Sequence, residues 1–366
     1  MASRKKVAVG MSGGIDSTIT ALLLKGKGYE VTGLTMKIWS GSMACNAVRS
    51  GCYGPGEASD IEDAKKAAAR LGIDHFVIDL CEEYGGTVLD YFGSEYTEGR
   101  TPNPCVMCNA KIKFGSFIEK ARSSGIPFDL FATGHYARIR YDAGSGRYML
   151  LRGMDRSKDQ SYFLHRLSQG QLSQVMFPLG EYSKEDVRKL ALEAGLSEYL
   201  EKRESQDFLE FEDYAGLLKE PPRPGNIVDT GGAVIGKHSG IAFYTVGQRR
   251  GLGLAGMKEP YYVLCIDAAK NEVVAGPKAC LMNNVLVAEN INWIIPFDER
   301  PDGPVQARIR STTPPAPCSV VPETAASATV YFEVFQESIT PGQSVVFYSD
   351  DVVLGGGTII RSSSKN

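Results

Sequence analysis

The sequence predicts an α/β protein: a doubly wound parallel sheet, followed by a small mixed central domain and a C-terminal β-barrel. Three observations support this. Apolar runs alternate with helical patterns over roughly the first 135 residues. Pro221-Pro222-Arg223-Pro224-Gly225 then interrupts the pattern, and short strands recur at barrel-like spacing from residue 283. We expect domains at 1–208, 209–282 and 283–366.

The elements of the first domain follow from its apolar spacing. We expect strands at 7–11, 29–36, 75–80 and 128–135, and helices at 18–24, 60–71 and 184–194. Ser59 or Asp60 is the expected N-cap of the second helix. In the last domain, strands are expected at 305–310, 328–334 and 344–348. Ligands of such a parallel sheet bind at the carboxyl ends of its strands.

The amino-acid composition limits which classes of function the protein can have. Hydrophobic residues make up 43% and charged residues 23% of the 366 residues, as in ordinary globular proteins. No run of 18 apolar residues occurs, so we expect a cytoplasmic protein without a membrane partner. The net charge of −3 gives no global basic field, although local basic patches suffice to bind RNA. Eight cysteines in a cytosolic chain favour metal or redox chemistry over a disulfide scaffold.

The first strand leads into Ser12-Gly13-Gly14-Ile15-Asp16-Ser17 and then into a helix. A glycine-rich turn at a helix N-terminus is suited to bind phosphate. The turn is not a Walker A loop, because no Gly-Lys-Ser/Thr ends it, and it lacks the third glycine of a dinucleotide fingerprint. A carboxylate among phosphates, that of Asp16, suggests a bridging Mg²⁺.

Cysteines gather in two places. Cys52 lies in a loop over 41–56, and Cys105 and Cys108 follow two prolines that bar a helix before Cys105. Lysines 111 and 113 follow the pair, so we expect its thiol pKa values to be depressed. A redox or zinc pair, with Cys45 as a further zinc ligand, is the alternative. We expect the remaining cysteines to be small core residues; these are Cys81, Cys265, Cys280 and Cys318.

Six motifs occur in one order along residues 6–361. They are Gly10-Met11-Ser12-Gly13-Gly14, Thr101-Pro102-Asn103-Pro104, Ala132-Thr133-Gly134-His135-Tyr136, Lys158-Asp159-Gln160-Ser161-Tyr162-Phe163-Leu164, Tyr244-Thr245-Val246-Gly247-Gln248-Arg249 and Thr340-Pro341-Gly342-Gln343. The chain therefore resembles the tRNA-specific 2-thiouridylases, and the 12–17 turn resembles the loop of the wider ATP pyrophosphatase class.

The resemblance implies a reaction and a set of residues. In that family ATP adenylates the C2 oxygen of uridine 34 in the tRNA anticodon, and sulfur then displaces AMP. The implied ATP-binding residues are Gly10, Met11, Ser12, Gly13, Gly14, Asp16, Ser17, Met36 and Gly134. Asn103 and Pro104 would border the target base, and His135, Lys158, Asp159, Gln160, Arg310 and Gln343 would contact tRNA. The implied partners are a tRNA anticodon stem-loop and a sulfur donor, either sulfide or a cysteine desulfurase relay.

The sequence departs from the family at its cysteines. The family has aspartate where Cys105 stands, and a second catalytic cysteine where this chain has Leu209. A leucine cannot hold a persulfide, so we hypothesise that Cys52, Cys105 and Cys108 hold a 4Fe–4S cluster with one open iron, as in some thiolation enzymes of the class. The alternatives are a persulfide on Cys108 without a cluster, and a zinc or structural role.

Two other function classes remain open at this point. An ATP pyrophosphatase of the amidating type would act on a small adenylated substrate, but it has no need of Cys105-x-x-Cys108 or of the 158–164 motif. A tRNA-binding protein that has lost catalysis would explain Leu209, but it has little use for Asp16. We therefore expect catalytic roles for Cys108, Cys105 and Asp16.

Overall fold

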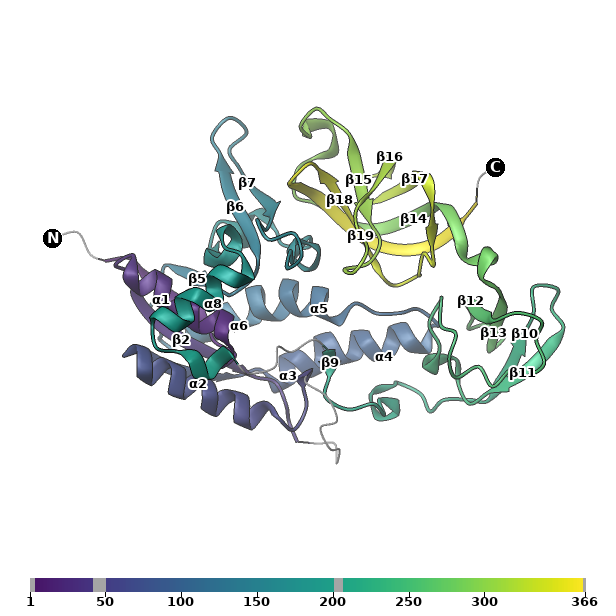
Figure 1. The fold of residues 1–366 in the computed structure, drawn as a ribbon, viewed down its shortest axis with the longest axis horizontal. Helices are drawn as coiled ribbons and strands as arrows, with labels where there is room; N and C mark the ends of the chain where they lie inside the picture. Colours follow the sequence, from purple (N-terminus) through teal and green to yellow (C-terminus); the bar gives the residue numbers. More distant parts are fainter. Residues whose placement is uncertain (1–3, 42–50, 201–206, 365–366) are drawn as a thin grey trace. The chain divides into compact units, whose positions relative to one another are not determined.

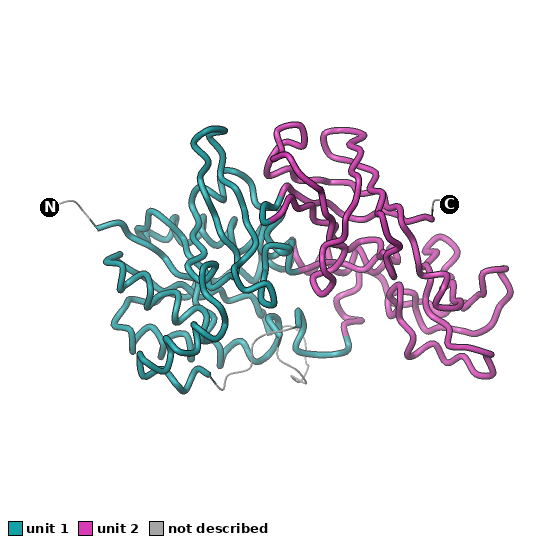
Figure 2. Tube along the Cα trace, turned by 45° about the horizontal axis from the view of Figure 1, so that its top comes forward, with its two compact units in different colours: residues 1–87, 105–213, 351–353 teal, residues 88–104, 214–350, 354–366 magenta. Residues whose placement is uncertain are grey.

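A computed structural model describes residues 4–41, 51–200 and 207–364 (Figure 1). The chain forms two compact units, each made of segments that are discontinuous in sequence (Figure 2). Unit 1 comprises residues 1–87, 105–213 and 351–353, and unit 2 comprises residues 88–104, 214–350 and 354–366. The three-domain division expected from the sequence stays a prediction.

Unit 1 contains a five-stranded sheet in which neighbouring strands are parallel. In sheet order the strands are β4 (Asp74–Asp79), β2 (Glu30–Lys37), β1 (Lys6–Gly10), β5 (Leu130–Ala132) and β8 (Val175–Met176). The predicted parallel sheet is confirmed. Strand order reverses between β1 and β5, so the loops that follow these two strands lie where such sheets bind ligands.

Helices pack on this sheet through apolar faces. Val7 and Val9 of β1 share a buried cluster with Ile19 and Leu24 of α1. The principal helices of the unit are α1 (Ile15–Gly26), α2 (Glu57–Leu71), α3 (Cys81–Tyr84), α6 (Phe117–Ser123), α7 (Gln169–Leu172) and α8 (Lys184–Glu193). Shorter 3₁₀ turns are η3 (Ser161–Leu164), η4 (Pro178–Glu181) and η5 (Ser197–Leu200).

The predicted N-cap of α2 is wrong. The helix begins at Glu57 behind Gly56, ahead of both Ser59 and Asp60. The Glu57 carboxylate accepts hydrogen bonds from the backbone N–H groups of Ile38, at 2.7 Å, and Trp39, at 3.1 Å. This glutamate therefore joins the start of α2 to the chain that leaves β2, a long-range contact that sequence capping rules do not describe.

The paired cysteines lie on an irregular helical stretch. α5 (Pro104–Met107) runs into the π-helix η2 (Cys108–Ser116), which continues as α6. Pro104 is the first helical residue, a position where its missing N–H costs nothing. A second π-helix, η1 (Gly85–Leu89), follows α3 and leads into α4 (Asp90–Thr97). π-Turns of this kind are frequent at functional sites.

Two small strand pairs complete unit 1. β6 (Ala137–Asp142) and β7 (Arg147–Arg152) form an antiparallel hairpin, and β7 also pairs with Val352 and Val353. β3 (Gly51–Tyr53) pairs in parallel with β9 (Asp207–Leu209). The second pair joins the Cys52 loop to a segment more than 150 residues later in the chain.

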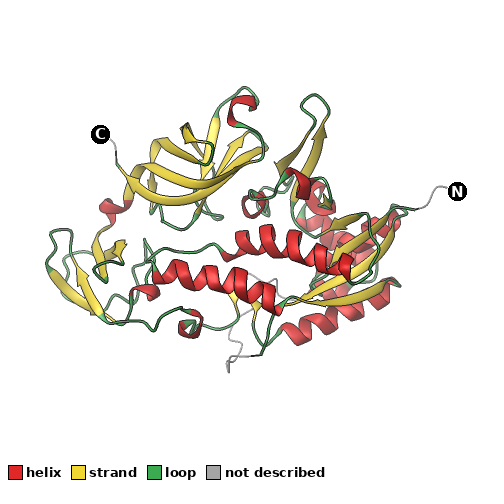
Figure 3. Cartoon of the chain, turned by 180° about the vertical axis from the view of Figure 1, so that it is seen from behind, coloured by secondary structure: helices red, strands yellow, loops and turns green. Residues whose placement is uncertain are grey.

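Unit 2 is rich in strands, drawn yellow in Figure 3. A four-stranded sheet has the order β11 (Val234–His238), β10 (Gly225–Val228), β13 (Glu272–Pro277) and β12 (Tyr261–Asp267). The C-terminal barrel contains β14 (Met282–Trp293), β17 (Ser327–Glu337), β16 (Ala316–Thr324), β15 (Val305–Arg308), β18 (Ser344–Ser349) and β19 (Val352–Ser363). Pairing of β14 with β19 closes it, which confirms the predicted barrel.

Short turns connect the strands of unit 2. They are η6 (Ala215–Leu217), η7 (Ile241–Phe243), η8 (Lys278–Leu281) and η9 (Phe297–Glu299). Among residues 4–41, 51–200 and 207–364, no helix combines the length and apolar character needed to cross a bilayer.

Candidate active site

The turn after β1 is closed by its own hydrogen bonds. The Ser12 N–H donates to Ser17 Oγ at 3.2 Å, and Ser17 Oγ donates to the Gly14 carbonyl at 3.0 Å. Gly13 has a φ of +71°, and a Cβ built there would lie 2.8 Å from the Asp60 carbonyl oxygen of α2. Glycine is therefore required at position 13, both for its backbone conformation and for the close approach of α2.

The remaining predicted ATP-binding residues surround this turn. Gly14 is the N-cap of α1 and has no side chain to occupy the N–H groups of the first helical turn. A Cβ on Gly134, just beyond β5, would lie 3.0 Å from backbone and Cβ atoms of Asp16. Met11 is tied to β2 because its carbonyl accepts from Thr35 Oγ1 at 2.8 Å, and Met36 follows Thr35. These residues thus lie together, and the helix N-terminus is suited to an anion.

Asp16 has two partners that the sequence did not reveal. Its carboxylate accepts from Lys184 Nζ at 2.7 and 2.8 Å and from the Tyr136 hydroxyl at 2.9 Å. Lys184 is the first residue of α8, and only 7% of it is exposed. No sequence motif pointed to this lysine, because its contact with Asp16 spans 168 positions.

Burial determines the pKa values of two thiols, Cys105 in α5 and Cys108 at the start of η2. It raises the pKa of Cys105 to about 12 and that of Cys108 to about 11. Proximity to Cys52 raises both values further, whereas the Lys113 ammonium lowers both. The expected depression of these pKa values is therefore wrong: desolvation of the thiolate outweighs the nearby lysine.

All three predicted cysteine ligands lie around one phenol. Burial raises the pKa of Tyr84 well above its usual value, and the charges of Cys108, Cys52 and Cys105 raise it further. The Tyr84 ring stacks on that of Tyr53, with ring centroids 5.5 Å apart. The three sulfurs therefore belong to one neighbourhood, which we call the thiol cluster (Cys52, Cys105 and Cys108).

The thiol cluster is not a preformed metal centre. Within the part of the chain that the structure describes, no group of three or more His, Cys, Asp or Glu side chains is arranged to hold a metal ion. The predicted metal site of Cys52, Cys105 and Cys108 is therefore not confirmed. Cys45, the alternative zinc ligand, lies outside the described residues.

The segment that carries Leu209 is bound to the Cys52 loop. Leu209 pairs with Tyr53 in the β3–β9 ladder and is 4% exposed. Glu210 donates its N–H to the Tyr53 carbonyl at 3.1 Å and accepts from the Gly56 N–H at 2.7 Å through its side chain. Asp207, at the start of β9, adds to the raised pKa of Cys105. Residues 204–206 of this segment lie outside the described residues.

The predicted tRNA-contacting residues of unit 1 hold the fold around Tyr136. The fully buried Asp159 carboxylate accepts from the Gly153 and Ser161 N–H groups, each at 3.1 Å. Gln160 Oε1 accepts from the Tyr136 N–H at 3.0 Å. Contact of these two residues and of the half-buried Lys158 with tRNA stays a prediction.

His135 lies among aromatic side chains. Burial, and then the charge of Lys113, lower its pKa well below the usual value. Its Nδ1 lies 2.7 Å from Thr133 Oγ1, and its ring lies between those of Phe114 and Phe177. Its contact with tRNA also stays a prediction.

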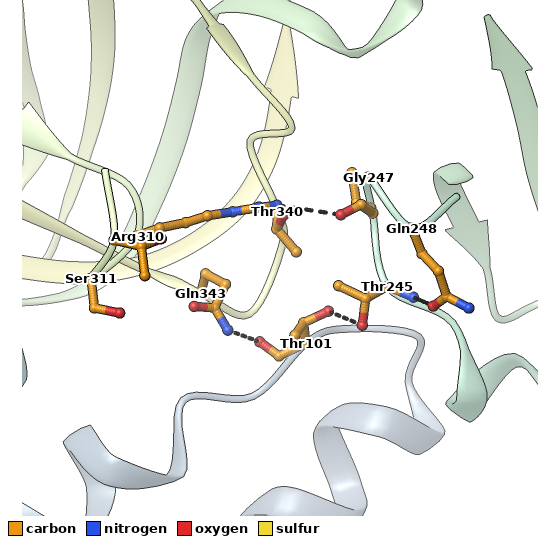
Figure 4. A pocket seen from close by; sticks show the side chains of 10 residues that line it. Thr101, Thr245, Gly247, Gln248, Arg310, Ser311, Thr340 and Gln343 are labelled. Atoms are coloured by element: carbon orange, nitrogen blue, oxygen red, sulfur yellow. Dashed lines mark hydrogen bonds between the residues drawn. The ribbon is translucent and has the colours of Figure 1, made fainter. Parts of the chain in front are cut away.

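Unit 2 holds the other predicted RNA residues beside a cavity of about 390 Å³ (Figure 4). Gln343 Nε2 donates to the carbonyl oxygens of Thr101, at 3.2 Å, and Pro102, at 3.0 Å, just before Asn103 and Pro104. The Arg310 guanidinium donates to Thr340 Oγ1 at 2.8 Å. Arg310 and Gln343 thus brace the loop and barrel that line the cavity, and their contact with tRNA stays a prediction.

Comparisons with known proteins cover nearly all of the chain. Residues 5–210 match a family model described as a tRNA methyl transferase HUP domain, residues 217–277 a tRNA methyl transferase PRC-barrel domain, and residues 283–359 an aminomethyltransferase beta-barrel domain. The tRNA-specific 2-thiouridylase MnmA of Endomicrobium trichonymphae is 46% identical over 98% of this chain and 100% of the relative. The protein of the same name from Carboxydothermus hydrogenoformans is also 46% identical, over 97% and 98% of the two chains.

The chain belongs to the tRNA-specific 2-thiouridylase family. The resemblance stated from the six motifs is thereby confirmed. Relative to the pattern of this thiouridylase family given above, the chain keeps the 12–17 turn and Cys108, and it has Leu209 in a buried strand at the place of the second cysteine.

Proposed function

We propose that this protein transfers sulfur to C2 of uridine 34 in tRNA anticodons at the expense of ATP. The uracil C2 oxygen attacks the α-phosphorus of ATP and pyrophosphate leaves. Sulfide sulfur then attacks C2, the C2–O bond breaks, and AMP leaves. The observation that carries this proposal is that one unit holds both a glycine turn at the N-terminus of α1, suited to phosphate, and the thiol cluster.

The nucleotide half of the reaction rests on the turn after β1. Backbone N–H groups of the first turn of α1 would bind the phosphates, and Gly13 and Gly14 allow the close approach this needs. Asp16 would hold the Mg²⁺ that accompanies ATP, since carboxylate oxygens are the protein ligands this ion prefers. The product AMP is a far better leaving group than the original oxygen.

The sulfur half rests on the thiol cluster. We propose that Cys52, Cys105 and Cys108 become the ligands of a 4Fe–4S cluster, which would supply an open iron for hydrosulfide. The protonated thiols must lose their protons to bind iron, so loading would release protons. A persulfide on Cys108 alone is the alternative, because Leu209 removes the second cysteine of the family in either case.

We propose that the RNA substrate is the anticodon stem-loop of a tRNA and that the reaction takes place in the cytoplasm. Single-stranded loop bases are splayed out and held by side chains in such complexes. Asn103 and Pro104 would border the extruded base, and the exposed end of β6 adds Arg140 and Tyr141 as candidate RNA contacts. The sulfur donor is sulfide or a cysteine desulfurase relay.

A reconstituted reaction tests this function. The anaerobically purified protein is treated with iron and sulfide and then incubated with unmodified tRNA, ATP, Mg²⁺ and sulfide, and the digested RNA is searched for 2-thiouridine. We expect product from the wild type and none from Cys108→Ala, with ATP binding unchanged in the variant. Cys81→Ala is the matched control, because Cys81 is a half-buried thiol of the same unit outside the thiol cluster.

The same preparation separates the candidate chemistries. Iron retained by the wild type and lost from Cys52→Ala supports the cluster. Thiolation by an iron-free protein that fails with sulfide, but proceeds with a cysteine desulfurase and cysteine as the source of persulfide sulfur and a thiol reductant to release the product, supports the Cys108 persulfide. ATP cleavage with a small amine acceptor and no RNA product would support an amidating enzyme. An absence of both RNA product and ATP cleavage would contradict the proposed function.

A further inference from the structure

We infer that Lys184 is an ATP-binding residue that exchanges partners. Without nucleotide its ammonium neutralises Asp16, and when Mg·ATP binds it moves to the triphosphate and leaves Asp16 to the metal ion. The inference rests on the proposed function only in requiring that the turn after β1 binds ATP.

The contact itself is the first observation. Lys184 Nζ lies 2.7 and 2.8 Å from the two carboxylate oxygens of Asp16, and 5.8 Å from the centre of the Tyr136 ring. Asp16 is the second residue of α1, whose N-terminus forms the predicted phosphate site. The ammonium is therefore already placed at the edge of the site that a triphosphate would enter.

The position of Lys184 is unfavourable for the fold, which is the second observation. A cation at the first position of a helix opposes the helix dipole, and burial of its ammonium costs solvation. Nevertheless Lys184 is 7% exposed at the start of α8. A lysine that served stability alone would gain more at the surface, as Lys189 does in its i,i+4 pair with Glu185.

The backbone around Lys184 is fixed while its side chain is long. Ser183 and Asp186 form a capping box at the start of α8, and the Lys184 N–H donates to Asp155 Oδ2 at 3.0 Å. Only the rotamers of the butylammonium chain need to change for Nζ to leave Asp16. Because lysine is a compact charge on a flexible stem, such a move requires no rearrangement of the helix.

Charge balance supplies the reason for the exchange. In the structure the Lys184 ammonium compensates the charge of Asp16, whose side chain is 27% exposed. Triphosphate brings several negative charges beside that carboxylate, so a site with Asp16 alone would repel metal-free ATP. The lysine and the magnesium ion together allow the carboxylate and the phosphates to occupy one site.

Binding measurements on Lys184→Met test the inference without turnover. Equilibrium dialysis with Mg·ATP and with adenosine should show the Kd for Mg·ATP raised about 30-fold and that for adenosine changed less than about twofold, because the lost interaction is with phosphate. Lys189→Met removes a charge from the exposed face of the same helix and should leave both constants unchanged. Lys184→Arg should recover most of the affinity for Mg·ATP.

Asp16→Asn provides a test in the opposite direction. It frees Lys184 from its carboxylate partner, so metal-free ATP, measured with a chelator present, should bind about fivefold more tightly than to the wild type. This variant keeps the shape of the side chain, and its amide oxygen can still accept a hydrogen bond from Lys184, so it remains informative if Lys184→Met fails to fold.

The contrary results are equally definite. Unchanged Mg·ATP binding by Lys184→Met, or equal losses for ATP and adenosine, would make Lys184 a structural residue only. Weaker binding of metal-free ATP by Asp16→Asn would also overturn the exchange. A different result is that the wild type binds ATP and the variants behave as expected while no 2-thiouridine is formed. That result would refute the proposed function and leave this inference standing.

Discussion

The turn after β1 and the thiol cluster are two regions of one unit, organised in different ways. Residues 12–17 close on themselves through short-range hydrogen bonds and present a finished helix N-terminus. The thiol cluster joins the segments around residues 52 and 105, the first of which pairs with residues 207–209. Burial raises the pKa values of Cys105 and Cys108, and the described residues hold no group of side chains arranged to bind a metal ion. The turn after β1 has its binding geometry before a ligand binds. The thiol cluster brings its three cysteines into one neighbourhood without forming a metal site in the described part of the chain.

This difference matches the chemistry that each region would serve. Phosphate is bound by backbone N–H groups, which are fixed by local folding. A sulfur carrier must load and discharge, and thiols become ligands or nucleophiles only when they lose their protons. Variants and conditions that affect one region and spare the other therefore test the comparison.

Alkylation rates should show the largest difference. With a pKa of about 11, Cys108 in the metal-free protein is almost entirely protonated near neutral pH. At about pH 8 iodoacetamide should modify it about 100-fold more slowly than an unperturbed cysteine, since only the thiolate reacts.

Peptide mass spectrometry measures the alkylation rates, with exposed Cys280 as the internal comparison. The pKa of Cys108 is raised, so its rate should increase about tenfold per pH unit until pH approaches its pKa. A rate that levels off below about pH 9 would show that the pKa is not raised.

A matched glycine pair tests the turn after β1. Gly13→Ala places a Cβ within 3 Å of α2 backbone atoms at a φ of +71°, so we expect a loss of about 2–3 kcal/mol in the free energy of unfolding and loss of ATP binding. Gly14→Ala meets only Ser12 Oγ, at 3.6 Å, and should keep its stability. Its ATP affinity should nevertheless fall about tenfold, because the phosphates need that space.

Chemical denaturation and equilibrium dialysis give the two quantities for each glycine variant. Equal stability of Gly13→Ala and Gly14→Ala would show that α2 does not pack against the turn as described. Unchanged ATP affinity of Gly14→Ala would place the phosphates elsewhere.

Leu209→Cys tests whether the absent family cysteine can simply be restored. Leu209 is buried in the β3–β9 pair, so the smaller side chain should lower the free energy of unfolding by about 1–2 kcal/mol. 2-Thiouridine formation should not rise, because the new thiol would lie in a packed strand. Leu209→Met, of similar volume, is the control, and a faster enzyme carrying Leu209→Cys would contradict this view.

Glu210→Gln should have the smallest effect. It replaces the charged acceptor of the Gly56 N–H, and we expect a loss of about 1 kcal/mol with little change in ATP binding. Chemical denaturation measures the loss in the free energy of unfolding, and equilibrium dialysis measures the change in ATP binding. An ATP affinity that falls as much as the stability would show that the two regions are coupled through the loop.

Local features were predictable from the sequence, and long-range ones were not. The 12–17 turn, the parallel sheet and the barrel follow from spacing and turn chemistry within a few residues. The partners Lys184 of Asp16 and Glu210 of Gly56 lie over 150 positions away, and the raised thiol pKa values depend on burial by the whole fold. No pattern of residues in the sequence predicts such contacts.

Side-chain exposure in short strands was another failure. Cys265 in β12 and Cys280 in the turn η8, both expected in the core, are exposed, and Cys81 is only half-buried, whereas Cys318 is buried as predicted. The pairing of β12 with β13 shifts register between Val263 and Cys265. A shift of one residue turns a side chain to the other face of a strand, and an apolar run does not reveal where that occurs.

Cys52→Ser tests the central claim, that three thiols from distant segments act together, most directly. The quantity to measure is 2-thiouridine formed per enzyme from unmodified tRNA, alongside the Kd for Mg·ATP. We predict that thiolation falls at least about 100-fold, as far as in Cys105→Ser and Cys108→Ser, while ATP binding is unchanged. Thiolation by Cys52→Ser within about threefold of the wild type would contradict the account and leave Cys108 to carry sulfur without the other two thiols.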